Sequence, residues 1–325
     1  MSGRVLVAPD DFKGTFTAPQ VTEALARGLR DGGVEAIELP VADGGDGTMA
    51  AIVTALEGEV RRVPVSDPLG RPIEAEFGLL PGGTTAVVEM AQASGLALLA
   101  QEELDPWGAS TRGTGELIVA AAEAGARKII VAVGGSATTD GGRGAVEAIE
   151  AAGVEVEIDV ACDVRVKYED APRVFGPQKG ADEEMIRRLG GRLDEYAQEA
   201  PRDPRGREMT GAAGGLSGGL WAYLGAQLVP GAPYVLDTVR FDERLRECSF
   251  VITGEGKLDE QTLTGKAVFE VATRCRQGGV ACHAVVGTRA LDDFQLRTID
   301  LASVREATTL DELEAAGRAL ADSPG

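Results

Sequence analysis

Residues 4–33 read RVLVAPDDFKGTFTAPQVTEALARGLRDGG, which is a strand, a polar loop and a helix in that order. The apolar run 5–8 predicts a buried strand. Residues 17–20, TAPQ, have the pattern of a capping box with proline in the first helical turn. Apolar residues at 21, 25 and 29 then share one helical face, which the glycine pair 32–33 ends. This stretch predicts the first strand and helix of an α/β fold.

The same rhythm of strand, glycine-rich loop and helix returns twice. A strand near 36–41 runs into ADGGDGT at 42–48, and a helix follows through Ile52 and Leu56. Near the other end come a strand at 250–253, the loop GEGK at 254–257, a helix at 264–277, strands at 281–286 and 301–304, and a last helix capped from Thr309. Such alternation is typical of parallel sheets. We therefore predict α/β architecture, with a doubly wound parallel-sheet domain formed by both termini.

The middle of the chain is predicted to be a second α/β domain, inserted into the first. It has its own strands at 85–90, 128–133 and 154–160, and helices at 115–124, 182–198 and 216–224. The expected boundaries are 1–62 and 245–325 for the terminal domain and 63–244 for the insert, with the active site in the cleft between them. Residues 202–207, RDPRGR, are the best candidate for a mobile loop.

The composition of the chain limits the classes of molecule that the protein is expected to bind. The net charge of −20 argues against nucleic acid and anionic membranes. The first residues contain no apolar run long enough for a signal peptide, so the sequence predicts a cytoplasmic protein. Only six lysines accompany 26 arginines, and four of the six adjoin a glycine. A lysine beside glycine is suited to reach phosphate oxygens in a loop, which indicates phosphate handling.

The predicted strand ends carry acids and lysines. Asp10 and Lys13 follow the first strand, Asp43 and Asp46 follow the second, and Glu255 follows the strand at 250. Because ligands of open parallel sheets bind outside the carboxyl ends of the strands, this edge has the groups that phosphoryl transfer needs. A strict Walker A motif and the G-x-G-x-x-G fingerprint are both absent, which disfavours an NAD-type oxidoreductase. For any one loop, a plain turn that caps the next helix remains an equally good interpretation.

The insert has similar loops. GGSATTDGG at 134–142 follows a strand and is a candidate anion nest, with Asp140 as a metal or hydroxyl partner. The segment 110–115 precedes a helix whose N-terminus could hold an anion. FGPQKG at 175–180 places Lys179 in another glycine loop.

Several of these motifs resemble the bacterial type I glycerate kinases. The resemblance rests on APDDFKG at 8–14, VADGGDGT at 41–48, EMAQASGL at 89–96, GTGEL at 113–117 and the loop 134–142, and continues through CDV at 162–164, 174–181, and 251–266. It covers nearly the whole chain in the family's order. The resemblance implies phosphorylation of glycerate with ATP and Mg²⁺, in most members at the 2-hydroxyl, and two α/β domains.

The resemblance and the loops together suggest roles for particular residues. Asp43 and Asp46 are the first candidates for orienting a metal or hydroxyl, and Asp163 is another. Lys13, Lys179 and Lys266 are expected to face phosphate or the glycerate carboxylate. The predicted catalytic residues are Lys13, Asp43, Asp46 and Asp163; the predicted binding residues are Asp10, Gly44, Gly45, Ser94, Gly134, Gly135, Ser136, Asp140, Gln178, Lys179, Gly254, Glu255, Gly256 and Lys266; and the predicted metal ligands are Asp43 and Asp163.

The insert departs from the family pattern. Thr139 stands where the family usually has Asn, the segment 145–161 is shortened by several tens of residues, and RVKY at 165–168 replaces Asn-Pro-Leu-x-Gly. Two alternatives therefore stay open: a non-catalytic nucleotide- or metabolite-binding regulator derived from the kinase fold, and a kinase of another small hydroxy acid. The expected partner is a small molecule, with the protein a monomer or homodimer, and the position phosphorylated and the catalytic base are left open.

Overall fold

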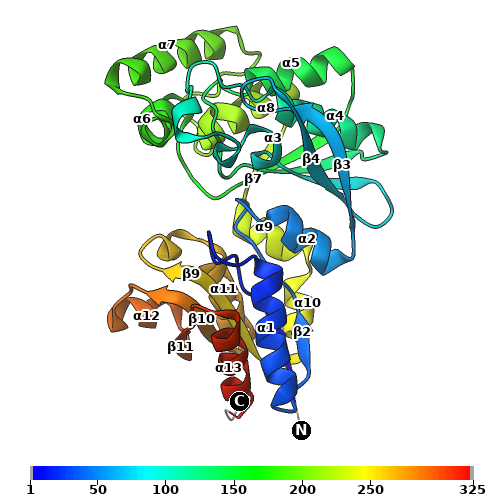
Figure 1. The fold of residues 1–325 in the computed structure, drawn as a ribbon, viewed down its shortest axis with the longest axis vertical. Coiled ribbons are helices and arrows are strands. Elements are labelled where there is room, and N and C mark those ends of the chain that lie inside the picture. Colours follow the sequence, from blue (N-terminus) through cyan, green and yellow to red (C-terminus); the bar gives the residue numbers. More distant parts are fainter. Residues whose placement is uncertain (1–2, 323–325) are drawn as a thin grey trace. The chain divides into compact units, whose positions relative to one another are not determined.

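The computed structural model describes residues 3–322, which divide into two compact units (Figure 1). Unit 1 comprises residues 3–43, 50–56 and 232–322, and unit 2 comprises residues 44–49 and 57–231. The predicted α/β class is confirmed for both units. Each unit has its own sheet and its own apolar core.

Unit 1 is built on a five-stranded sheet in which every pairing is parallel. In spatial order its strands are β2 (Ala36–Glu38), β1 (Arg4–Val7), β9 (Cys248–Leu258), β10 (Ala281–Arg289) and β11 (Ser303–Glu306). Numbered within the unit, this order is 2-1-3-4-5, so the direction in which strands are added reverses between β1 and β9. Such a reversal is a topological switch point, where the loops after neighbouring strands part and leave room for a ligand.

Helices cover both faces of this sheet, as the doubly wound prediction requires. The helices of unit 1 are α1 (Ala18–Asp31), α2 (Thr48–Leu56, of which 50–56 belong to this unit), α9 (Gly231–Thr238, of which 232–238 belong to it), α10 (Phe241–Leu245), α11 (Ala267–Gly278), α12 (Asp293–Ile299) and α13 (Leu310–Ala321). The predicted capping boxes at Thr17 and Thr309 are both formed. In Figure 1, α1 and α13 lie side by side. Their backbones touch where a side chain on Gly28 would meet Glu314 O at 1.9 Å and one on Gly317 would meet Leu25 O at 2.3 Å.

The alternation along β1 explains why the sheet needs helices on both faces. Val5 and Val7 belong to one apolar cluster with α1 and α13, whereas Leu6 is buried on the opposite side. On α11, Val268 and Val271 are fully buried, as the helical spacing predicts. Each face buries aliphatic side chains and so stabilises the unit by the removal of apolar surface from water.

The chain enters and leaves unit 2 earlier than the sequence suggested. The expected boundaries were 62/63 and 244/245, whereas the main divisions between the units lie at 56/57 and 231/232, and residues 44–49 also belong to unit 2. The second difference has a clear cause in Arg274 of α11. Its guanidinium pairs with Asp237 at 2.7 Å and Asp242 at 3.3 Å, and donates to Pro233 O at 3.1 Å. These contacts join α9 and α10 to unit 1.

Unit 2 has a six-stranded mixed sheet. In order, its strands are β3 (Glu59–Ser66), β4 (Pro72–Leu79), β5 (Thr85–Glu89), β6 (Lys128–Ala132), β7 (Glu157–Cys162) and β8 (Gln227–Pro230). The pairs β3–β4 and β4–β5 are antiparallel, and the remaining pairs are parallel. The sequence predicted β5, β6 and β7. It did not predict the β3–β4 hairpin, because β3 has exposed residues and a proline rather than a continuous apolar run.

The helices of unit 2 follow the predicted order, with additions. They are α3 (Ala91–Ser94), α4 (Arg112–Glu123), α5 (Arg143–Ala152), α6 (Ala171–Phe175), α7 (Glu183–Glu199) and α8 (Leu216–Leu224). The core gathers Met90, Leu117, Ile118 and Val131 with residues of α5 and α8. The shortened segment 145–161 forms most of α5 and of β7. This segment therefore forms one compact helix-to-strand connection.

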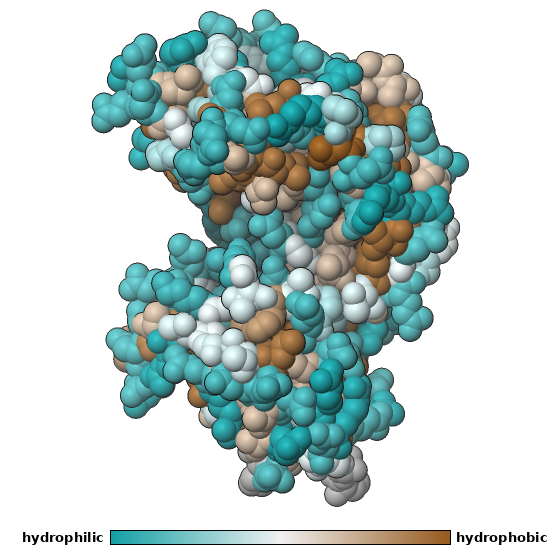
Figure 2. Space-filling view, viewed as in Figure 1, coloured by the Kyte–Doolittle hydropathy of each residue, from teal (hydrophilic) through white to brown (hydrophobic). Residues whose placement is uncertain are grey.

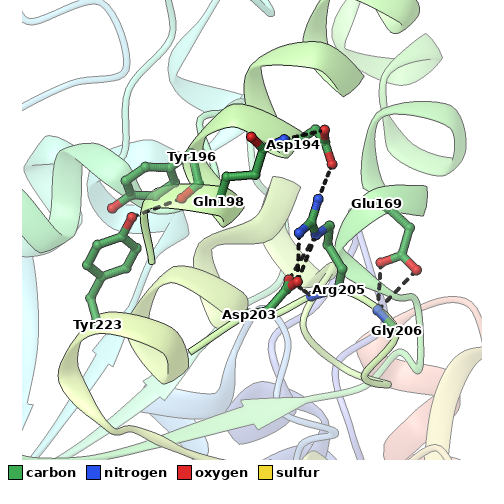
Figure 3. A network of polar contacts seen from close by, with 8 residues as sticks. All are labelled: Glu169, Asp194, Tyr196, Gln198, Asp203, Arg205, Gly206 and Tyr223. Atoms are coloured by element: carbon green, nitrogen blue, oxygen red, sulfur yellow. Dashed lines mark hydrogen bonds and ion pairs between the residues drawn. The ribbon is translucent and has the colours of Figure 1, made fainter. Parts of the chain in front are cut away.

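The loop 202–207, which the sequence suggested as mobile, is tied to its surroundings (Figure 3). Arg205 pairs with Asp203 at 2.7 Å and also contacts Asp194 on α7. The Gly206 N–H donates to the Glu169 carboxylate at 3.0 Å. These contacts hold the loop against α7 and the segment before α6.

On the face shown in Figure 2, the surface of the described residues is largely hydrophilic, with a few apolar patches. Across residues 3–322, none of the helices combines the length and the apolar character needed to cross a lipid bilayer.

Candidate active site

Unit 1 contains a cavity of about 380 Å³ at the carboxyl ends of its parallel strands. Its walls come from the loop after β1, the last residues of β9 and the segment that follows it, the end of β10, and the segments after β2 and β11. The lining residues are Asp10, Asp11, Phe12, Lys13, Thr15, Asp43, Glu255, Gly256, Lys257, Asp259, Gln261, Lys266, Gly287, Thr288 and Thr308. The cavity thus lies at the switch point between β1 and β9 and includes six of the residues predicted for the site.

Asp10 directly follows β1 and is almost fully buried. Its backbone N–H donates to Gly254 O at 2.8 Å, and its carboxylate accepts the N–H of Asp11 at 2.7 Å. Burial and the negative charges of Asp43 and Asp11 raise the pKa of Asp10 well above its ordinary value, and Lys13 opposes the shift in part. The cavity therefore holds more negative charge than its lysines neutralise.

Glu255 lies in β9 and is 8% exposed. The Thr262 hydroxyl donates to its Oε1 at 2.5 Å. Burial raises the pKa of Glu255 to about 7, while the Thr262 hydrogen bond and the charge of Lys266 act in the opposite direction. A carboxylate with a pKa near neutrality can accept a proton from a hydroxyl and release it again.

The segment 254–257 is not a loop, contrary to the prediction. It belongs to β9, which continues to Leu258 and pairs with β10 as far as Arg289. Glycine is needed there for packing: a side chain on Gly254 would meet Val285 O at 2.1 Å, and one on Gly256 would meet Phe12 Cα at 3.1 Å. The two glycines allow close approach of backbones, so the segment was wrongly predicted to be a loop, and Gly256 still lines the cavity.

Three lysines line the cavity of unit 1. Lys13 stands on the loop after β1, Lys257 pairs with Asp259 at 3.2 Å, and Lys266 immediately precedes α11. The charge of Lys13 acts on Asp10 and that of Lys266 acts on Glu255. The lysine ammonium groups can bind an anion, and the buried carboxylates beside them can bind a metal ion.

Unit 2 contains a separate cavity of about 750 Å³. Leucine, alanine and glutamine side chains form most of its walls, together with three acids. The lining residues are Asp46, Glu74, Glu89, Ala91, Gln92, Leu96, Ala97, Leu98, Leu99, Gln101, Leu104, Gly135 and Gln178. Asp43 and Asp46, three residues apart in the sequence, therefore line different cavities.

The glycines of the loops 44–48 and 134–135 allow these two loops to pack closely at the polar end of the cavity. A side chain on Gly134 would meet Gly45 Cα at 2.7 Å, and one on Gly135 would meet the Asp46 carboxylate at 2.7 Å. Val133 N–H donates to Gly44 O at 3.1 Å. Gly44, Gly45 and Gly134 are outside the cavity lining, and close backbone packing accounts for them.

Asp140 has a structural role that the sequence analysis did not foresee. Its carboxylate accepts the N–H and the hydroxyl of Thr111, each at 2.8 Å, and the N–H groups of Gly142 and Gly144 at 3.1 and 3.3 Å. These donors lie at the starts of α4 and α5, where a negative charge is favourable. Asp140 therefore supplies a negative charge at the starts of both helices.

Ser94, Ser136 and Lys179 are buried and bonded within unit 2. The Ser94 hydroxyl lies 2.8 Å from Thr114 Oγ1. Lys179 Nζ donates to Ser136 Oγ at 2.8 Å and to Thr138 O at 2.5 Å. Burial lowers the pKa of Lys179 to about 7, with Asp140 acting in the opposite direction. None of these three side chains lines either cavity, although Gln178, next to Lys179, does.

Asp163 is exposed just after β7 and lies in unit 2, outside both cavity linings, whereas Asp43 lies in unit 1. Across residues 3–322, no three His, Cys, Asp or Glu side chains gather as a metal site made by protein alone.

The sequence analysis also missed Thr262, Glu74 and Glu89. Glu89 and Thr262 each had a signal, since they lie in the motifs 89–96 and 251–266, whereas Glu74 had none.

The 2-1-3-4-5 sheet and the acid–lysine cavity at its switch point are typical of enzymes that handle phosphate. Comparison with known proteins agrees, since the glycerate kinase family model matches residues 5–155 and 150–322. Among curated relatives, the glycerate kinase of Halalkalibacterium halodurans is 40% identical, covering 87% of this chain and 85% of the relative, and the glycerate 2-kinase of Escherichia coli is 39% identical, covering 83% and 81%. The chain belongs to the glycerate kinase family.

A solved structure agrees over the whole chain. A crystal structure from Salmonella typhimurium LT2, described as glycerate kinase 2, is 32% identical and superposes with a TM-score of 0.85 over 99% of this chain and 98% of that chain. The predicted family resemblance is confirmed.

Proposed function

We propose that this enzyme transfers the γ-phosphoryl group of ATP to glycerate, with D-glycerate as acceptor and 2-phosphoglycerate as product. The observation that carries the proposal is the cavity of unit 1, where Asp10, Asp43 and Glu255 meet Lys13 and Lys266 at the switch point of the sheet. Phosphoryl transfer depends chiefly on positioning and charge neutralisation, which these groups supply. The E. coli relative is named a 2-kinase, which supports the 2-hydroxyl as acceptor.

Glu255 is the carboxylate best suited to accept the proton of the glycerate hydroxyl. It is buried, it lines the cavity, and its pKa of about 7 matches the pH at which it would work. The Thr262 hydroxyl holds one oxygen of the carboxylate. We therefore assign proton acceptance to the other oxygen of the carboxylate.

Lys13 and Lys266 are proposed to bind the glycerate carboxylate and the transferring phosphate. A compact ammonium group on a flexible stem can follow a phosphate as its charge shifts during transfer. Lys179 is not assigned to this task, because its ammonium group already donates to Ser136 and Thr138 inside unit 2.

The residues present fit a magnesium ion held together with nucleotide phosphates. Mg²⁺ usually takes only one or two protein carboxylates and completes its shell with water and phosphate oxygens. Asp10 and Asp43 would hold it, and the mutual repulsion that raises the pKa of Asp10 would then be relieved. Bound Mg²⁺ neutralises charge on the transferring phosphate. Asp163 as a metal ligand, and the contribution of both units to one active site, stay predictions.

We also propose that the enzyme works in the cytoplasm on free glycerate, as a monomer or homodimer, with neither nucleic acid nor membrane as partner. The net charge of −20 supports the absence of nucleic acid and membrane partners, since it disfavours binding to polyanions. The lysines of the unit 1 cavity would attract a small anion locally.

The test is a coupled assay of ADP release with ATP, Mg²⁺ and D-glycerate, with the product identified by phosphorus NMR. We expect glycerate-dependent ADP release and a 2-phospho product. ATP binding without glycerate-dependent release would favour the regulator hypothesis. Release with another small hydroxy acid at much higher kcat/KM than with glycerate would reassign the acceptor.

A further inference from the structure

We propose that the cavity of unit 2 binds the nucleoside part of the ATP, that is, a flat neutral base and a ribose. This inference rests on the proposed function, because it assumes ATP as the phosphoryl donor. It assigns a ligand to the cavity of unit 2, which has no role in the phosphoryl transfer proposed for the cavity of unit 1.

The walls of the cavity match a base and exclude an anion. Leu96, Leu98, Leu99 and Leu104 supply apolar surface, and Leu96, Leu98 and Leu99 come from a single segment after α3. Figure 2 shows apolar residues on the surface of unit 2 around the place of α3 in Figure 1. Within the described part of the chain, the lining includes no lysine, arginine or histidine. A glycerate carboxylate or a triphosphate would therefore lack a cation there.

The polar groups of the cavity are acceptors and amides. Asp46, Glu74 and Glu89 offer carboxylate oxygens to ribose hydroxyls or to an exocyclic amino group, and Gln92 and Gln178 can donate and accept. A carboxylate that accepts from a ribose hydroxyl is a recurrent feature of nucleotide sites. Glu89 is held in place because its Oε1 accepts the Met49 N–H at 2.6 Å.

The cavity of unit 1 lacks these features. Phe12 is its one large apolar side chain among the described residues, and it is 2% exposed, so it offers little surface to a base. A volume of about 750 Å³ in unit 2 is ample for a nucleoside, whereas the cavity of unit 1 has about half that volume. The triphosphate would extend out of the acidic cavity of unit 2, since like charges repel it.

Kinetics of two variants at Leu98 test the assignment. Leu98 is partly buried, so its replacement should leave the fold intact. Leu98→Ala should raise the KM for ATP severalfold, and Leu98→Asp should raise it at least about tenfold, because apolar contact is lost and a charge is placed against the base. The KM for glycerate should change less than about twofold. The matched control is Leu69→Asp, at a leucine of unit 2 that is 36% exposed and outside the cavity.

Photolabelling with 8-azido-ATP decides the matter without a variant. We expect label on peptides from 91–104 in the wild-type enzyme, suppressed by excess ATP. Label confined to unit 1 peptides, an unchanged KM for ATP in both Leu98 variants, or a raised KM for glycerate in place of ATP would each overturn the assignment. Absence of glycerate-dependent ADP release from wild-type enzyme would instead contradict the proposed function, and the labelled peptides would still locate the base.

Discussion

The ammonium group of Lys179 lies 2.8 Å from the hydroxyl of Ser136, and both side chains are buried in unit 2. Its second acceptor is Thr138 O in the same loop. A lysine that is 1% exposed joins the segment before α7 to the loop after β6. This arrangement gives Lys179 a structural role, and we expect it to make the stability of unit 2 depend on pH.

We expect the stability of the wild type, measured relative to Lys179→Met, to rise by about 2 kcal/mol between pH 7 and pH 9. Burial lowers the pKa of Lys179 to about 7, so above that pH the unfolded chain binds more protons than the folded one. The free energy of unfolding therefore rises with pH up to the unfolded pKa. Urea denaturation at several pH values measures it, with the exposed Lys167→Met as control. If the free energy of unfolding changed with pH by the same slope in all three proteins, Lys179 would have to stay fully charged.

Asp140→Ala should destabilise the protein by roughly 3 kcal/mol, because four donors lose one charged acceptor. Asp140→Asn should lose less, since one oxygen remains. Thermal unfolding followed by circular dichroism would measure both. A metal or substrate role would give a different pattern, namely a stable variant with lost activity.

Gly254→Ala should destabilise unit 1 by about 1–3 kcal/mol, because the added carbon would lie 2.1 Å from Val285 O in the neighbouring strand. Gly190→Ala is the matched control. Gly190 lies within α7 with no atom near its missing side chain, so alanine there should stabilise the protein by up to about 1 kcal/mol. Denaturant titrations of the two variants should shift in opposite directions. If Gly254→Ala left the free energy of unfolding unchanged, Gly254 would again be a candidate ligand-binding residue.

Glu255→Gln should lower kcat by about a hundredfold or more, since the proton acceptor is lost. In the wild type, kcat/KM should rise with pH up to about 7, because Glu255 accepts a proton only when ionised and burial raises its pKa to about 7. This rise should disappear from the residual activity of the variant. Glu260→Gln, at an exposed neighbour, is the control. A wild-type pH profile that persists in Glu255→Gln would assign the base to another carboxylate.

Lys13→Ala and Asp43→Ala should each cut turnover at least about a hundredfold and leave the fold intact, because charge-stabilising groups are typically worth several kcal/mol to a transition state. Lys13→Arg should rescue poorly, since a planar fork does not replace a point charge in a narrow loop. ADP release measures turnover, and circular dichroism checks the fold. Near-normal rates in both alanine variants would remove these residues from the site.

Elements whose signals are local were predicted well. The capping boxes at Thr17 and Thr309 need only side chains three residues apart, and both form as expected. The β3–β4 hairpin was missed, because partly exposed antiparallel strands leave a weak apolar pattern. The second limit between the units was missed for another reason, since the contacts of Arg274 with Asp237 and Asp242 join residues more than 30 apart in the chain.

The sequence by itself determined the α/β class, the parallel sheet made by both termini, the family, and six residues of the unit 1 cavity, because these depend on periodicity and on which residues follow each strand. Only the tertiary structure decided what each polar residue does. Asp140 and Lys179 look like ligand-binding groups in the sequence, yet their partners at Thr111 and Ser136 are brought from segments 29 and 43 residues away. Asp43 and Asp46 share one loop but line different cavities. Burial and non-local hydrogen bonds set these roles, and neither can be read from neighbours along the chain.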